Sequence, residues 1–105
     1  MKQVRLFLDY NCHPIWVYED NNESSIENGI SSIDEIKNNE DLVMLLDEIQ
    51  REYESLFINN SIEFRYVGFK DKKKQISFEN KLEKAYRMLE SILKDKYEVI
   101  YDIYL

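Results

Sequence analysis

Apolar and polar residues alternate along three stretches of the chain, which is the pattern of a strand with one buried face. These stretches cover residues 4–10, 62–66 and 97–105. A fourth run, residues 15–18, is β-branched and aromatic and follows Pro14, which cannot donate a hydrogen bond to a sheet. The pattern therefore predicts four strands.

Two other stretches repeat apolar residues every three or four positions, which is the spacing of an amphipathic helix. The first stripe consists of Leu42, Leu45, Leu46, Ile49, Tyr53 and Leu56, and the second of Phe78, Leu82, Ala85, Leu89, Ile92 and Leu93. Asn38 or Asn39 can cap the first helix, and Asn59 and Asn60 can end it.

The segments between these elements are polar. Residues 19–31 are rich in Asn, Ser and Glu and predict an acidic loop, followed by a short helical turn at residues 32–37. Residues 70–74 hold four lysines, which we interpret as a solvated turn that leads into the second helix.

The elements follow one another in the order ββαβαβ. This order favours an α+β fold, in which two amphipathic helices pack on a mostly antiparallel four-stranded sheet. The length suits one domain that spans residues 1–105. The order of the strands in the sheet stays open, because several pairings satisfy the same alternation.

Charge is distributed unevenly along the chain, whose formal net charge is −7. Residues 1–60 hold thirteen acidic and four basic residues, whereas residues 61–105 hold eight acidic and ten basic residues. Such a field attracts basic partners and repels nucleic acid and anionic membranes. Since neither a signal-peptide core nor an apolar run of about 18 residues occurs, we expect a soluble cytoplasmic protein that binds neither nucleic acid nor membrane.

Residue types suited to catalysis are scarce, because the chain has one His, one Cys and two Gly. Cys12 and His13 are neighbours that point in different directions in an extended segment, and no second His or Cys completes a metal site. An acidic chain also offers little positive charge to stabilise a thiolate. We therefore expect no enzyme activity, no metal and no cofactor. The alternative is a small enzyme or ligand-binding domain that uses Asp9, His13 and nearby carboxylates.

The polar face of the first predicted helix is acidic. At 100° per residue, Asp47, Arg51 and Glu54 lie opposite the apolar stripe, with Glu48 beside them. Such a face either keeps the helix solvated or docks a basic partner, and we favour docking. The eight tyrosines also suggest exposed aromatic rings, so a Tyr or Trp16 can anchor the partner. The candidate partner-binding residues are Glu19, Asp20, Glu23, Glu27, Asp41, Asp47, Glu48 and Glu54.

Five segments resemble a known class of proteins in their order and spacing. They are Leu6-Phe7-Leu8-Asp9-Tyr10, Pro14-Ile15-Trp16, Leu45-Leu46-Asp47-Glu48-Ile49-Gln50, Tyr53-Glu54-Ser55-Leu56-Phe57 and Glu63-Phe64-Arg65-Tyr66-Val67-Gly68-Phe69. Together they resemble immunity proteins of bacterial polymorphic-toxin and contact-dependent growth inhibition systems. The resemblance implies a cytoplasmic antidote that binds the toxin domain of its cognate effector, often a nuclease, and it transfers no site residues. A self-associating adaptor is a further alternative, and the oligomeric state stays open.

Overall fold

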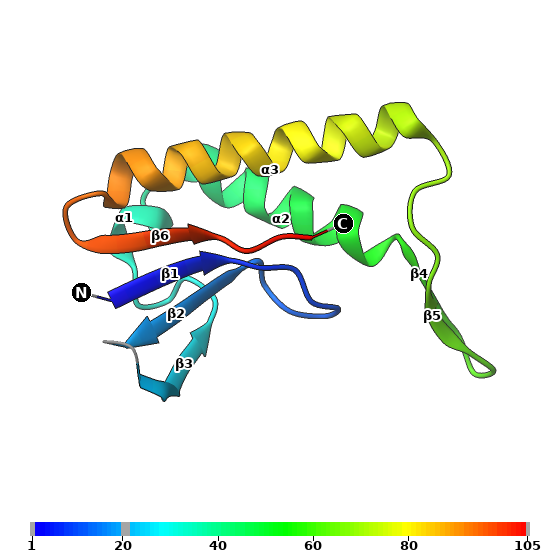
Figure 1. Ribbon diagram of the computed structural model, residues 1–105, viewed down its shortest axis with the longest axis horizontal. Coiled ribbons are helices and arrows are strands. Elements are labelled where there is room, and N and C mark those ends of the chain that lie inside the picture. The colour runs from blue at the N-terminus through cyan, green and yellow to red at the C-terminus, as the bar shows by residue number, and fades with distance from the viewer. Residues whose placement is uncertain (1, 20–21, 105) are drawn as a thin grey trace.

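The main structural element is a sheet of four strands in the order β3-β2-β1-β6. A computed structural model describes residues 2–19 and 22–104, the side chains of residues 22–25 excepted. The strands are β1 (Lys2–Leu6), β2 (Ile15–Glu19), β3 (Asn22–Asn28) and β6 (Tyr97–Tyr101). β1 and β3 run antiparallel to β2, whereas β6 runs parallel to β1, with Val4 opposite Val99 (Figure 1).

The α+β class is confirmed, but the predicted sheet is wrong in two respects. The sheet is mixed rather than mostly antiparallel, because α3 carries the chain back across the sheet before β6 and so sets β6 parallel to β1. Its fourth member is β3, from a segment that the sequence predicts as an acidic loop. Strand β3 is polar because it pairs on one side only, at the edge of the sheet.

The third predicted strand does not join this sheet. Its residues form β5 (Phe64–Tyr66), which pairs antiparallel with β4 (Phe57–Asn59) in a separate two-stranded hairpin. The Asn60 side chain closes the turn by accepting hydrogen bonds from the backbone N–H groups of Ile62 and Glu63, at 2.8 and 2.9 Å. The hairpin projects from one end of the molecule, beyond the sheet and the helices (Figure 1).

Both predicted helices are confirmed. They are α2 (Glu40–Glu54) and α3 (Lys72–Leu93), preceded by the short helix α1 (Asp34–Lys37) where a helical turn is predicted. Asn39 caps α2 as expected, since its side chain accepts a hydrogen bond from the N–H of Leu42 at 3.1 Å. α2 ends earlier than predicted, before β4, and α3 begins inside the predicted basic turn because Asp71 caps it.

The core lies between the sheet and α2 and α3, which cover the same face of the sheet (Figure 1). Its largest fully buried side chains include Leu6 of β1, Leu46 of α2 and Phe78 of α3. The alternate residues of the strands face away from the helices; there Arg5 lies 4.4 Å from the ring centre of Tyr18. No helix in the described part of the chain is both long and apolar enough to cross a membrane.

Truncation of Leu46 tests this packing. We expect Leu46→Ala to lower the free energy of unfolding by about 2–5 kcal/mol, because the change leaves a cavity among fully buried side chains. Urea unfolding followed by circular dichroism measures the loss. Met44→Ala, on the same helix but 69% exposed, is the control and should change stability by less than about 0.5 kcal/mol. Equal losses in the two variants would contradict the assigned core.

Candidate protein-binding surface

The outward side of α2 carries the acidic face that the sequence predicts. Asp47 and Arg51 are exposed and Glu54 is half-buried, and together with Gln50 they line a shallow depression. The Gln50 amide donates a hydrogen bond to the Glu54 carboxylate at 3.3 Å, which orients that carboxylate along the helix. These residues share one side of α2 because the other side packs its leucines and Ile49 into the core.

The loop between β1 and β2 brings another carboxylate to this side of α2. Burial raises the pKa of the Cys12 thiol, and the negative charges of Asp9 and Glu54 raise it further. Asp9 also adds to the effect of burial in raising the pKa of Tyr53. The loop and the C-terminal half of α2 therefore form one negatively charged region, which we call the acidic region: Asp9, Asp47 and Glu54.

Hydrogen bonds hold His13 in this loop and give it a structural role. Its Nδ1 accepts a hydrogen bond from the N–H of Ile15 at 3.1 Å. Its backbone N–H donates to the Asn28 side chain at 2.9 Å, and its backbone oxygen accepts from the same side chain at 2.7 Å. With Nδ1 occupied and the neighbouring thiol kept protonated, this pair lacks the activated nucleophile that Cys–His catalysis requires.

The remaining predicted site residues lie apart from the acidic region. Glu48 faces α3, where Lys81 binds it at 2.7 Å and binds Glu52 at 2.5 Å. Asp41 is exposed at the start of α2, about 20 Å along the helix from Glu54. Asp20 lies outside the described residues, as does the side chain of Glu23.

Two of the predicted acids are engaged on the sheet. Glu19 pairs with Lys2 at 2.9 Å, at the opposite end of β1 from the Asp9 loop. Glu27 accepts a hydrogen bond from Ser31 at 2.8 Å, which ties β3 to the turn before α1. The structure therefore brings together Asp47 and Glu54 of the predicted set and adds Asp9, but it does not bring Glu19 or Glu27 to them.

The β4–β5 hairpin adds aromatic surface beside the acidic region. Tyr10 packs against the rings of Phe57 and Phe64, with ring centres 4.9 and 4.8 Å apart, and its hydroxyl accepts a hydrogen bond from Asn59 at 3.0 Å. Phe64 and Tyr66 stay 53% and 50% exposed in spite of these contacts. Exposed rings held by neighbouring rings suit a protein interface, because little side-chain freedom is lost on binding.

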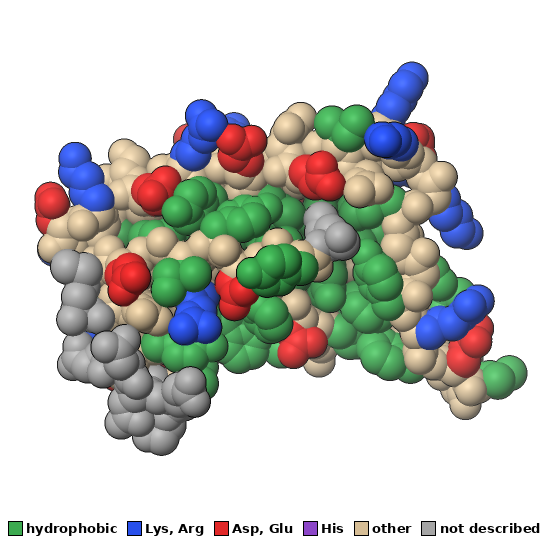
Figure 2. Space-filling model, in the orientation of Figure 1, with side chains coloured by type: hydrophobic (Ala, Val, Ile, Leu, Met, Phe, Trp, Pro, Cys, Tyr) green, Lys and Arg blue, Asp and Glu red, His purple; other side chains and the backbone are tan. Residues whose placement is uncertain are grey.

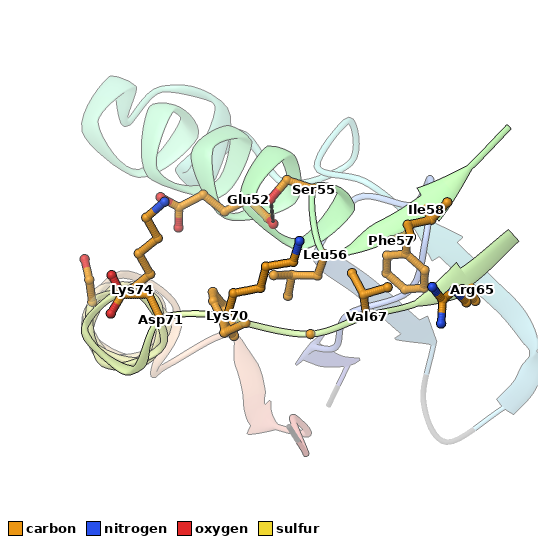
Figure 3. A pocket seen from close by; sticks show the side chains of 13 residues that line it. Glu52, Ser55, Leu56, Phe57, Ile58, Arg65, Val67, Lys70, Asp71 and Lys74 are labelled. Atoms are coloured by element: carbon orange, nitrogen blue, oxygen red, sulfur yellow. Dashed lines mark hydrogen bonds between the residues drawn. The ribbon is translucent and has the colours of Figure 1, made fainter.

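A groove of about 720 Å³ lies on the other side of the hairpin, between the end of α2 and the start of α3. Figure 3 shows Leu56, Phe57 and Val67 along it, and Lys70 and Lys74 reaching over it toward α2. Sequence reasoning misses this groove because its walls come from separate segments, residues 52–58 and 65–77. The alternating apolar residues at 62–66 are the available signal, but alternation alone predicts a strand of the main sheet.

One face of the molecule is apolar in the middle and charged at its margins (Figure 2). Figure 2 shows hydrophobic side chains gathered between α3 and the sheet and continuing toward the β4–β5 hairpin. Lys and Arg side chains gather around the hairpin end of the molecule, where α3 begins. In the hairpin, Ile62 is 91% exposed and Phe64 is 53% exposed.

Comparison with known families identifies the class of protein. A family model described as Serratia CdiI immunity protein-like matches residues 2–103. The chain belongs to this family. A search of the curated proteins finds none that matches it. The match confirms the resemblance to contact-dependent growth inhibition immunity proteins.

Membership in the immunity-protein family indicates the role of the chain. It implies an antitoxin role, in which the chain binds a cognate toxin protein, and such proteins are generally not enzymes. In residues 2–19 and 22–104, no three His, Cys, Asp or Glu side chains come together as a metal site would need. The acidic region and the aromatic hairpin are therefore candidate contact surfaces for the toxin.

His13 offers a pH test of this structure, because it is the single histidine of the sequence. Burial lowers the pKa of His13 from its ordinary value of 6.5, against the weaker opposing charge of Asp47. The unfolded chain therefore binds a proton more readily at His13 than the folded chain does. The contribution of His13 to the free energy of unfolding is complete above pH 6.5 and is lost as the pH drops toward the folded pKa. NMR titration of the His13 ring should give a pKa below 6.5.

The matching stability measurement uses urea unfolding at about pH 7.5 and 5.5. We expect a lower urea midpoint at the acidic pH, and a smaller difference in His13→Asn, whose side-chain oxygen can still accept the hydrogen bond from Ile15. A measured pKa at or above 6.5, or the same pH dependence in both proteins, would contradict the lowered pKa of the half-buried His13.

Proposed function

We propose that this immunity protein neutralises its toxin by binding the toxin domain through the acidic region, with the exposed rings of the β4–β5 hairpin as apolar anchors. The observation that carries the proposal is the joint position of Asp47 and Glu54 on α2 with Asp9 in the loop. Carboxylates grouped in this way raise the association rate of a basic partner and make it sensitive to salt.

The chemistry of the proposed partner follows from charge. The chain carries a formal net charge of −7, so it associates most readily with a basic domain. Domains that cleave RNA or DNA must approach phosphates and are commonly basic. We therefore propose that the toxin is a basic nuclease met in the cytoplasm, and that this protein covers the surface with which the toxin approaches its substrate.

The rings of the hairpin complement the charges. Phe64 packs on Tyr10, which follows Asp9 in the loop, and Tyr66 packs on Phe57, so apolar and acidic groups adjoin. Interfaces of this kind place aromatic side chains at the centre and charges at the rim. Trp16, a predicted anchor, suits that role less well: it is half-buried and its indole N–H donates to the backbone oxygen of Phe7 at 3.1 Å.

The first experiment identifies the toxin. The tagged protein is used to capture partners from its native cells, with washes at low and then high salt, and the bound polypeptides are identified by mass. A stoichiometric basic polypeptide that stops growth when expressed alone, and not when expressed with this protein, supports the antidote function. Under the alternative, in which Asp9 and His13 form an enzyme or ligand site, no such polypeptide is retained and His13→Ala abolishes a measurable activity.

Charge reversal tests the acidic region once the toxin is in hand. We expect Asp47→Lys/Glu54→Lys to weaken toxin binding about tenfold or more and to flatten its dependence on salt, because both residues lose their attraction for the basic partner. Surface plasmon resonance at several salt concentrations measures both effects. Glu90→Lys/Asp95→Lys makes the same change in net charge at the far end of α3 and is the control. Equal effects of the two double variants would assign the loss to net charge alone.

A further inference from the structure

The groove between α2, the hairpin and α3 carries basic side chains at its edges, in contrast to the acidic region. Its floor is apolar, with Leu56, Phe57, Val67 and Phe69 along it, and Arg65, Lys70 and Lys74 stand at its edges. Its volume, about 720 Å³, lies within the range of small-molecule sites. The groove is thus a second feature beside the hairpin, apart from the surface assigned to the toxin above.

In the part of the chain that the structure describes, two of the three basic residues at the groove form no direct ion pair, whereas Arg65 pairs with Glu63 at 3.5 Å. Of the two carboxylates that line the groove, Glu52 binds Lys81 at 2.5 Å, and Asp71 caps α3 by accepting from the N–H of Lys73 at 2.8 Å. Within the described residues no carboxylate comes within 4.0 Å of the Lys70 or Lys74 ammonium group. Lys70 and Lys74 therefore lie at the edge of an apolar floor without a direct ion pair to any described residue.

Lys74 lies in the first turn of α3, and Lys70 lies just before this helix. The first turn holds Lys72, Lys73 and Lys74, and the one carboxylate next to it is that of the cap residue Asp71, although the N-terminal end of a helix carries a partial positive charge. Lysine at this end destabilises a helix, whereas a carboxylate nearby stabilises it. A negatively charged occupant of the groove removes this repulsion, and an apolar group beside it covers the floor.

We propose that the groove seats an extended segment of the toxin chain in which carboxylates flank a large apolar side chain. The apolar side chain lies on Leu56 and Val67, and the carboxylates meet Lys70 and Lys74. This proposal rests on the proposed function, since the occupant is the toxin. It adds a region of positive charge to the interface. The acidic region meets the basic surface of the toxin, and the groove binds an acidic, apolar segment.

The test compares two double variants with the same change in net charge. Lys70→Glu/Lys74→Glu reverses the charges at the groove, whereas Lys72→Glu/Lys73→Glu reverses two exposed lysines of the same turn that do not line it. Both changes favour the helix dipole of α3, so both proteins should fold, and thermal unfolding checks this. The probe is the toxin domain identified by the capture experiment. We expect the groove variant to bind it about tenfold more weakly and the control variant within about twofold of the wild type.

A second pair of variants, one in the groove and one outside it, tests the apolar floor. Val67→Asp introduces a carboxylate into the groove, and Ile76→Asp introduces one at an exposed position of α3 outside it. We expect Val67→Asp to weaken binding about tenfold or more and Ile76→Asp to leave it unchanged. A photo-activated cross-linker placed at residue 70 then reports which toxin segment lies there, and mass spectrometry should find a segment that contains Asp or Glu beside an apolar residue.

The possible outcomes separate the two proposals. A wild-type protein that neither binds nor neutralises any toxin overturns the proposed function and this inference with it. Tight binding by the wild type with equal affinities for the groove and control variants overturns the groove alone. Cross-links to a basic segment, or a groove that binds only a small molecule and never the toxin, also overturn the groove and leave the acidic region standing.

Discussion

The contact between the apolar stripes of α2 and α3 and one face of the sheet is the constraint on which the rest of the structure depends. Side chains such as Leu6, Leu46 and Leu82 are fully buried there, and the burial of apolar surface is the main favourable term in folding. Because α2 and α3 must both turn their leucines inward, the rotation of each helix is fixed. The carboxylates of α2 are outward for that reason, so the acidic face is a consequence of the core.

The same contact explains why the β4–β5 hairpin can serve as a surface rather than as core. The sheet already has two helices across its covered face, and the hairpin begins only after α2 has ended, at Phe57. Its rings therefore pack on one another and on Tyr10 instead of entering the core, and Phe57 and Phe64 stack with ring centres 5.4 Å apart. A small cluster of this kind keeps aromatic surface rigid but accessible, which a partner can use with little loss of entropy.

The sequence predicts those parts of the fold that depend on local periodicity and misses those that depend on pairing. Both long helices follow from the spacing of their leucines, and Asn39 follows from the chemistry of helix caps. Strand β3 is hidden because an edge strand needs no apolar alternation, and β5 is misassigned because alternation does not say which strand is the neighbour. The parallel pairing of β1 with β6 joins residues more than ninety positions apart, which no local pattern reports.

The candidate surface likewise has parts that the sequence predicts locally and parts that depend on long-range contacts. Asp47 and Glu54 follow from helical phase alone, whereas the engagement of Glu48 by Lys81 depends on a residue 33 positions away. The groove depends on two segments that meet only in the folded chain, so its lysines look like a solvated turn in the sequence. An interface with both positive and negative charge distinguishes between partners better than an acidic interface does. A toxin must match two charges in the correct relative positions, and a like charge at either position is repelled. Such a pattern lets a small antidote recognise its own toxin among other basic domains, which net charge alone cannot achieve.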